Sequence, residues 1–517
     1  MTNSTGTAYK RRVVNSMAWN QPAGLQRRQW PAVVGIAKLD VGAQRADPDT
    51  SNRRISTLAQ LIRELLHRKK FLHALGDRRG RYTQKPTLTI SCGALVLSQF
   101  RLQSRGAPFG NLLSAAAPKV DASASSCDKG GMSSAISIDP HYLVARLKAL
   151  LAIPSPTGFT DEAVRHTARE LERLGLEVVL TRRGAIRARR PGAARRPARG
   201  IVSHLDTLGA QIKLLKPNGR LELVPIGHWS ARFAEGARAS IFSVKGTYRG
   251  SILPLKASGH TFNEEVDTQP SGWRHVELRV DALARNQHDL TQLGIDVGDI
   301  VAIDPAPEFL ENGFIVSRHL DDKAGVAVML AALEAMNREK VETPVDTYWL
   351  FTIGEEVGVG ASAVVTPDIA SLVAVDNGTT APGQNSSEFG VTLVMADQTG
   401  PFDYHLCKKL FELCGANGIR VQKDVFRYYR SDAASAVEAG HDVRTALLAF
   451  GVDASHGYER IHLHALISVA KLVVHYLASQ IEIERDAEET AVGLKGFTHQ
   501  KVPEAEQALT PEDGQES

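Results

Sequence analysis

The chain of 517 residues is 43% hydrophobic and 23% charged, proportions that are ordinary for a globular protein of two or three domains. Its four cysteines form no CxxC pair, which argues against a disulfide framework or a zinc–thiolate site and predicts a reducing cytoplasm. No apolar run approaches the roughly eighteen residues that span a bilayer, so no contact with a membrane is expected.

The charge is divided unevenly along the chain. Residues 1–131 hold 21 of the 61 basic residues and 7 of the 57 acidic ones, a balance of +14, and the remainder therefore carries −10. Because this first part shows little sustained periodicity, we interpret it as a disordered or artefactual extension and expect the true start at Met132. A basic arm for nucleic acid or a membrane surface and a targeting segment are the alternatives.

The predicted elements begin after Met132 with two amphipathic helices, followed by a short buried strand at 200–209 with the sequence "GIVSHLDTLG". Residues 210–306 then contain short alternating strands separated by Gly and Pro, which predicts an all-β insert with a core of its own. Helices and apolar strands resume over 307–481. The acidic residues 482–517 are predicted to form a disordered tail.

Polar side chains gather at the ends of the predicted strands. They are His204 and Asp206 in "HLD", Asp321 and Asp322 in "HLDDKAG", Glu355 and Glu356 in "GEEVG", Asp376 in "VAVDNG", and His456 in "ASHGYE". Strand ends form one edge of an open α/β sheet, so we expect these groups to converge. Any one carboxylate could simply cap the next helix, but Lys323 cannot balance the whole set. The sequence therefore predicts a divalent metal site, for which imidazole and carboxylate suit Zn, Co or Mn rather than Ca.

Six segments resemble, in their order and approximate spacing, the M42 glutamyl-type aminopeptidases, which are dinuclear metallopeptidases. The segments are "IPSPTGFTDEA", "SHLDTLG", "RHLDDKAG", "GEEVGVGA", "AVDNG" and "SDAASA", and the resemblance covers about residues 140–480. It implies an α/β fold with a mixed central sheet flanked by helices, formed by the catalytic parts 132–209 and 307–481. The small all-β domain at 210–306 would serve as a lid or in assembly. The chain also resembles a bacterial branch linked to the osmoprotectant N-acetylglutaminylglutamine amide.

The resemblance assigns roles to the residues of the first two acidic motifs. His204 would be a ligand of one metal ion, and Asp206 would orient it, fixing its tautomer and raising its basicity. Asp321 would bridge two divalent ions, Zn in the first place and Co or Mn as alternatives. The peptide bond between Asp321 and Asp322 is expected to be cis. Lys323 stands where the family has arginine, so the charge is kept without the bidentate fork.

The remaining roles also follow from the resemblance. Glu355 would be the general base, while Glu356 would bind one metal ion and Asp376 the other. The family shows a "RYxHSPxE"-like segment for its last ligand, whereas this chain has "ASHGYERIHLH". We take His456 as that ligand. His462 and His464 are the alternatives, although both fit a helix, where a structural histidine is the more common case.

The function implied by the resemblance is hydrolysis of peptide bonds at the N-terminus of peptides. Glu355 would take a proton from the attacking water and pass it to the leaving amine. The expected partners are a peptide or dipeptide-like substrate and further copies of the chain, with no nucleic acid for the catalytic part. Two alternatives remain: a metal-dependent deacylase or amidohydrolase of an N-acylated peptide-like metabolite, and a non-catalytic binding protein. The intact Glu355–Glu356 pair argues against the latter.

A shortened protein that starts at Met132 is expected to fold and keep full activity, because residues 1–131 contribute no predicted ligand and little apolar periodicity. Expression of both forms, followed by measurement of soluble yield, metal content and turnover, checks this. Loss of soluble, metal-bound protein on shortening would show that the extension belongs to the fold.

Overall fold

The computed structural model describes residues 90–91, 94–95, 136–490 and 492–498, and the chain divides into two units between Ser125 and Ser126. In the first unit the described residues form an antiparallel pair of strands, β1 (Ile90–Ser91) and β2 (Ala94–Leu95). The other predictions for residues 1–131, and those for the end of the acidic tail, lie outside the described residues.

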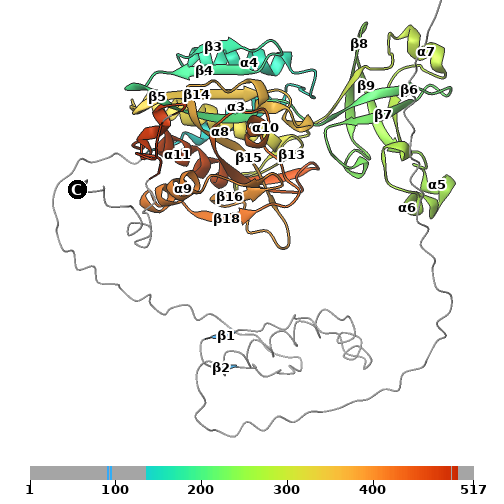
Figure 1. The fold of residues 1–517 in the computed structure, drawn as a ribbon. Coiled ribbons are helices and arrows are strands. Elements are labelled where there is room, and N and C mark those ends of the chain that lie inside the picture. Colours follow the sequence, from blue (N-terminus) through green and yellow to red (C-terminus); the bar gives the residue numbers. More distant parts are fainter. Residues whose placement is uncertain (1–89, 92–93, 96–135, 491, 499–517) are drawn as a thin grey trace, which may run out of the picture. The chain divides into compact units, whose positions relative to one another are not determined.

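A large mixed sheet forms the centre of the second unit (Figure 1). Its order is β12-β13-β20-β19-β15-β5-β14-β4-β3, and β16 adds to β19 with β17 and β18 beside it. The strands are β3 (Glu177–Leu180), β4 (Ile186–Arg190), β5 (Ala194–His204), β12 (Glu308–Phe309), β13 (Phe314–Ser317), β14 (Val345–Thr352), β15 (Ile369–Thr380), β16 (Val391–Asp397), β17 (Gly400–Pro401), β18 (Val421–Val425), β19 (Arg444–Asp453) and β20 (Glu459–His462).

The four central strands, β14, β5, β15 and β19, run parallel to one another, and their outer neighbours are antiparallel. Parallel strands are covered on both faces and therefore need apolar residues on both. The sequence of β14, "VDTYWLFT", is buried at every position. This arrangement brings the C-terminal ends of the central strands to one edge of the sheet.

Helices flank the sheet and complete the main core. They are α3 (Pro140–Leu151), α4 (Asp161–Arg173), α8 (Leu320–Arg338), α9 (Tyr404–Ala416), α10 (Asp432–Glu438) and α11 (Leu463–Ala478). The small residues of α8 allow close packing, and it contacts α3, α11, β5 and β15, so most of its length is buried. The side chain of Asp139 caps α3 by accepting from the N–H groups of His141 and Tyr142, at 2.8 and 3.3 Å.

A closed β-barrel with its own apolar core is inserted between β5 and β12. Its strands are β6 (Gly209–Leu215), β7 (Leu221–Ile226), β8 (Arg238–Ser243), β9 (Gly246–Pro254), β10 (Val276–Val280) and β11 (Ile300–Ile303), in the order β10-β7-β6-β11-β8-β9. Short helices α5 (Gly259–Phe262), α6 (Glu265–Thr268) and α7 (Gln287–Gln292) lie in its connections. The predicted fold class, a mixed α/β sheet flanked by helices with a small inserted all-β domain, is confirmed.

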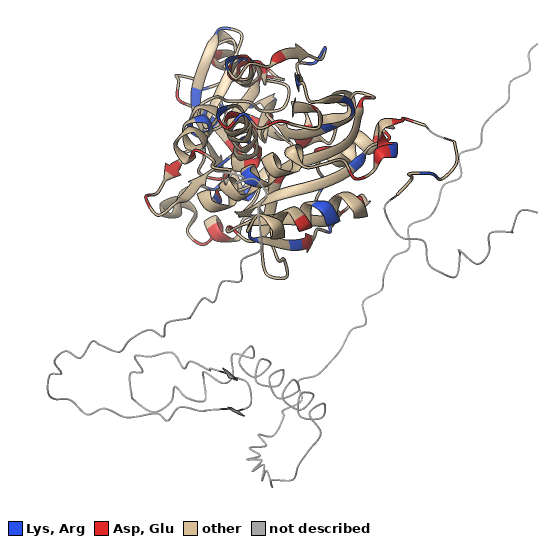
Figure 2. Cartoon of the chain, turned by 90° about the vertical axis from the view of Figure 1, so that its left-hand side faces the viewer, with Lys and Arg blue, Asp and Glu red and all other residues tan. Residues whose placement is uncertain are grey.

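Lys and Arg are interspersed with Asp and Glu over the described elements in the view of Figure 2. Within the described part of the chain, no helix has both the length and the apolar character that crossing a membrane requires.

Gly451 in β19 is a point where the main chain allows no side chain. A Cβ atom there would lie 2.1 Å from the carbonyl oxygen of Ser387. Gly451→Ala is therefore expected to lower the free energy of unfolding by about 1–3 kcal/mol, since the main chain at Ser387 would have to move. Gly415→Ala, in α9 with open space around it, is the matched control and is expected to be neutral or slightly stabilising. Equal midpoints of denaturant unfolding for the two variants would contradict this account.

Candidate metal centre

The predicted site residues converge at the C-terminal edge of the central strands. His204 ends β5, and Asp376 lies in β15. The pair Asp321–Asp322 lies in the first turn of α8 after β13, and Glu355 begins the 3-10 helix η3 (Glu355–Val357) after β14. The edge of an open α/β sheet collects groups that are far apart in sequence, as the strand pattern predicts.

The first group of potential ligands consists of His204, Asp321 and Asp376. All three side chains are buried, and one potential ligand atom from each lies within 4.8 Å of the others. Nε2 of His204 is 3.1 Å from Oδ1 of Asp321. The three groups can therefore surround a single cation.

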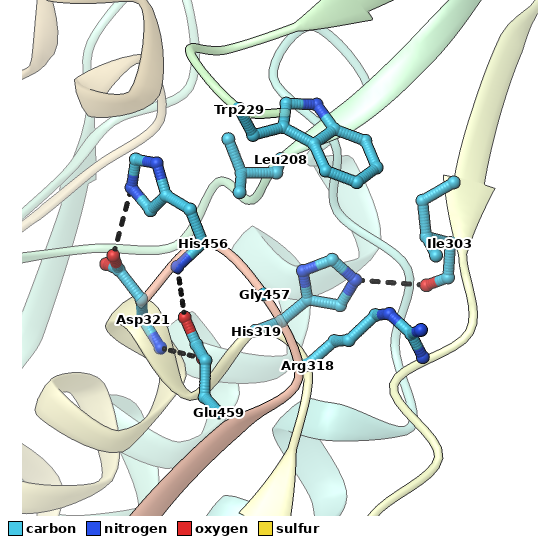
Figure 3. Close-up of a pocket in the computed structure, with 9 residues that line it drawn as sticks. All are labelled: Leu208, Trp229, Ile303, Arg318, His319, Asp321, His456, Gly457 and Glu459. Carbon is cyan, nitrogen blue, oxygen red and sulfur yellow. Dashed lines mark hydrogen bonds and ion pairs between the residues drawn. The ribbon is translucent and has the colours of Figure 1, made fainter. Parts of the chain in front are cut away.

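A second group of potential ligands includes His456, whose ring lies beside Asp321 (Figure 3). Nε2 of His456 is 3.4 Å from Oδ2 of Asp321 and 3.7 Å from Oε2 of Glu356. Each carboxylate oxygen of Asp321 thus faces a different imidazole. A carboxylate placed in this way can be shared by two cations.

Main-chain carbonyl groups orient both imidazoles. Nδ1 of His204 lies 2.8 Å from the carbonyl oxygen of Asp206, and Nδ1 of His456 lies 2.8 Å from that of His228, in the inserted barrel. A proton donated from Nδ1 to the carbonyl leaves Nε2 free to bind a metal ion. Both rings are therefore held in the tautomer that a ligand requires.

Asp206 contacts His204 through its main chain rather than through the expected side chain. Its carboxylate is 3.7 Å from Nδ1 of His204. It accepts instead from the hydroxyl of Thr157, at 2.7 Å, and from the main-chain N–H groups of Glu355 and Glu356, at 3.2 and 3.3 Å. The side chain of Asp206 consequently positions the loop that carries the two glutamates.

Asp322 and Lys323 do not form a pair. The expected cis peptide bond between Asp321 and Asp322 is present. The carboxylate of Asp322 accepts from the hydroxyl of Ser203. The ammonium group of Lys323 turns away and donates to the main-chain carbonyl groups of Leu150 and Ile153. Burial lowers the pKa of Lys323 to about 7, so this residue is a poor source of positive charge for the site.

The site stabilises positive charge. Burial and neighbouring carboxylates raise the pKa of Glu356 to about 8 and that of Asp376 to about 7. Burial opposes protonation of His456, but the hydrogen bond to Asp321 and the charge of Glu356 outweigh it and raise the pKa of His456 to about 11. No Lys or Arg of the described chain forms an ion pair with these carboxylates.

The donor set fits divalent metal ions. Oε1 of Glu356 is buried and has no hydrogen-bond partner among the described residues. Carboxylate oxygens and imidazole nitrogens together are typical ligands of Zn, Co or Mn. The buried carboxylates and the unpartnered oxygen of Glu356 thus fit a divalent metal ion.

The alternative histidines do not join this cluster. His462 caps α11, its Nε2 lies 3.0 Å from the carbonyl oxygen of Asn312, and its ring packs on Phe314 and Phe389. His464 lies near Phe389 as well. Both are therefore structural in this fold.

Glu459 is a site residue that sequence reasoning did not select. Its buried carboxylate accepts from the main-chain N–H of Asp321, at 3.1 Å, and from that of His456, at 3.0 Å. It thus ties together the two loops that carry these side chains. The available signal was the acidic residue three positions after His456 in "SHGYE".

The chain is similar to known peptidases in sequence. Residues 184–472 match the profile of the family described as M42 glutamyl aminopeptidase. YhfE of Bacillus subtilis (strain 168), whose aminopeptidase name is provisional, is 36% identical over 334 residues, which cover 64% of this chain and 96% of that protein. The glutamyl aminopeptidase of Lactococcus lactis subsp. cremoris (strain MG1363) is 24% identical over 229 residues, 43% of this chain and 62% of that protein.

Solved structures share the fold. The TET aminopeptidase of the marine sediment archaeon Thaumarchaeota archaeon SCGC AB-539-E09 aligns with a TM-score of 0.61 at 19% identity, over 67% of this chain and 99% of that chain. The TET1 peptidase of Pyrococcus horikoshii can assemble into a tetrahedron or a large octahedral shell. It aligns with a TM-score of 0.57 at 20% identity, over 65% of this chain and 99% of that chain. On the sequence matches, this chain belongs to the M42 glutamyl aminopeptidase family and is a metallopeptidase.

Proposed function

We propose that the protein is an aminopeptidase that uses two divalent metal ions and Glu355 as the general base. The observation that carries this proposal is the position of Asp321, whose two carboxylate oxygens face His204 and His456 at 3.1 and 3.4 Å. Two sets of ligands share one carboxylate there, which supports a dinuclear rather than a mononuclear centre.

The ligands divide into two sets around that shared carboxylate. His204 and Asp376 would hold one ion, Glu356 and His456 the other, and Asp321 would bridge them. When bound, the ions would lower the pKa of a water molecule and polarise the scissile carbonyl group. Zn is the first candidate for both positions, with Co and Mn as alternatives.

Glu355 is placed to move a proton within this centre. Its main-chain N–H is held by Asp206, and its Oε2 lies 3.7 Å from Nε2 of His204. Burial, with the negative charges of Asp376 and Asp432, raises the pKa of Glu355 well above its usual value. A carboxylate with a raised pKa can take the proton of the attacking water and deliver it to the leaving amine.

The proposal includes a peptide or dipeptide-like substrate with a free N-terminus and a homo-oligomeric enzyme. The assembly of the Pyrococcus horikoshii TET1 peptidase into closed shells supports an oligomer. The thiols of Cys407 and Cys414, which are buried and free, support a reducing compartment such as the cytoplasm.

Two substitutions within "GEEVG" separate the base from the ligand. Glu355→Gln keeps the shape of the side chain but cannot accept a proton, so kcat should fall by about 10²–10⁴-fold while KM and metal content change little. Glu356→Gln should lower metal affinity instead, and excess metal should partly restore turnover. Steady-state kinetics on unblocked and N-acetylated dipeptides, with metal analysis, measure these effects.

Glu412→Gln, on the exposed side of α9, is the control and should leave kcat and metal content unchanged. If Glu355→Gln were rescued by metal while Glu356→Gln stayed inert but fully loaded, the two roles would be exchanged. Near-normal turnover in both variants, or cleavage of N-acetylated dipeptides only, would refute the proposed aminopeptidase activity.

Asp321→Asn tests the shared carboxylate. An amide offers one neutral oxygen in place of two anionic ones, so this variant should lose both metal ions. Asp376→Asn should weaken one site more than the other. Metal content after dialysis, with circular dichroism as a check on folding, distinguishes these results. About two ions per chain in folded Asp321→Asn would exclude the bridging role.

A further inference from the structure

Tyr429 lies in the segment between β18 and α10, next to the metal centre, and has no part in the mechanism above. Its ring packs on Phe426, with centroids 5.1 Å apart, and lies against the main core. Its main-chain carbonyl accepts from the N–H of Gln398 at 3.0 Å. The ring and the backbone are therefore both held in place, which fixes the direction of the hydroxyl group.

The hydroxyl of Tyr429 is buried among the carboxylates of the centre. Its oxygen completes no hydrogen bond with any described residue. Burial, followed by the negative charges of Asp376, Asp321 and Glu355, raises the pKa of Tyr429 well above its usual value. A phenol with the ordinary pKa of about 10 already keeps its proton at neutral pH, so the buried hydroxyl is available as a donor.

Asp376 is the nearest candidate acceptor within the protein. The hydroxyl is close enough to its carboxylate to oppose the rise that burial causes in the pKa of Asp376, but it does not meet the distance and angle of a full hydrogen bond. Oδ1 of Asp376 already accepts from the main-chain N–H of Asn377 at 2.6 Å and from its side-chain amide at 3.2 Å. The other oxygen is the one that would bind a cation, so a bound molecule can offer the phenol a better acceptor than Asp376 does.

Amide hydrolysis supplies such an acceptor. The carbonyl oxygen of the scissile bond gains negative charge when water attacks, and enzymes stabilise it with donors that are already oriented. Tyr429 is a donor of this kind, held rigidly and shielded from water. Its position beside Asp376 and Glu355 places it next to the proposed metal ions and the proposed base.

We propose that Tyr429 is a further catalytic residue, which donates a hydrogen bond to the carbonyl oxygen of the scissile amide as that oxygen becomes negatively charged. The phenol keeps its proton throughout, so no bond to it is made or broken. The inference rests on the proposed function for the identity of the reacting group.

The neighbouring Tyr428 offers a matched control. Its side chain is 92% exposed, so Tyr428→Phe deletes a hydroxyl group that faces solvent and leaves the site unchanged. Tyr429→Phe keeps the ring that packs on Phe426, and the fold should therefore survive. Both variants and the wild type are compared as metal-loaded, full-length proteins.

The experiment measures kcat and KM on unblocked dipeptides, metal content, and the affinity of a phosphinic dipeptide analogue. The tetrahedral phosphinate of this analogue imitates the attacked carbonyl group. Tyr429→Phe should lower kcat and weaken analogue binding by about 10²-fold, with KM and metal content unchanged. Tyr428→Phe should match the wild type in all four quantities.

Two results would overturn the proposal. One is a Tyr429→Phe protein whose kcat and analogue affinity stay within about twofold of the wild type. The other is a loss of metal content that added metal reverses together with turnover, which would make Tyr429 a positioning residue for Asp376. If the wild type cleaves no unblocked dipeptide, the proposed function fails, and analogue binding still decides the role of Tyr429: a loss confined to Tyr429→Phe supports it, and equal or absent binding refutes it.

Discussion

Repulsion among buried carboxylates at one edge of the sheet is the constraint on which this site depends. Glu356 and Asp376 are buried near Asp321, and burial raises their pKa values to about 8 and about 7. Without a cation these groups would compete for protons near neutral pH. Divalent metal ions would remove that competition because they replace protons as the counter-charge, so metal binding and the protonation state of the site are linked.

The protein fixes the loops around these charges with main-chain hydrogen bonds rather than with Lys or Arg. Two successive N–H groups of the "GEEVG" loop donate to the carboxylate of Asp206. The N–H groups of Asp321 and His456 donate to that of Glu459. Such contacts fix the loops without neutralising the site, so the negative charge stays available for a cation. A salt bridge in the same position would have weakened the attraction for metal.

Much of this arrangement could be predicted from the sequence because it follows from regular periodicity. Apolar strands that each end in a carboxylate predict a polar edge in a parallel sheet, and short strands separated by Gly and Pro predict the β insert. The choice between His456, His462 and His464 depended on a tertiary detail, and His462 ends β20 rather than lying in a helix as expected. His456 sits in the tight connection between β19 and β20 with φ of 63°, where a left-handed backbone turns its ring toward Asp321.

Other parts of the site left no periodic signal. Tyr429 lies on an irregular connection, where alternation says nothing about the direction of a side chain. The contact between His204 and the main-chain carbonyl of Asp206 could not be predicted either, because every residue has a main-chain carbonyl group and the sequence does not show which one is used. Sequence patterns and the family resemblance therefore selected the carboxylates and imidazoles, but they could not identify the neutral groups that orient them.

The carbonyl of His228 that holds His456 belongs to the inserted barrel, and so does the carbonyl of Ile303, which lies 3.0 Å from Nε2 of His319. The barrel has a hydrophobic core separate from that of the sheet. Two cores that could form independently thus share the histidines around Asp321. The geometry of the metal centre therefore depends on both cores, since the barrel has to be docked for the carbonyl of His228 to hold His456.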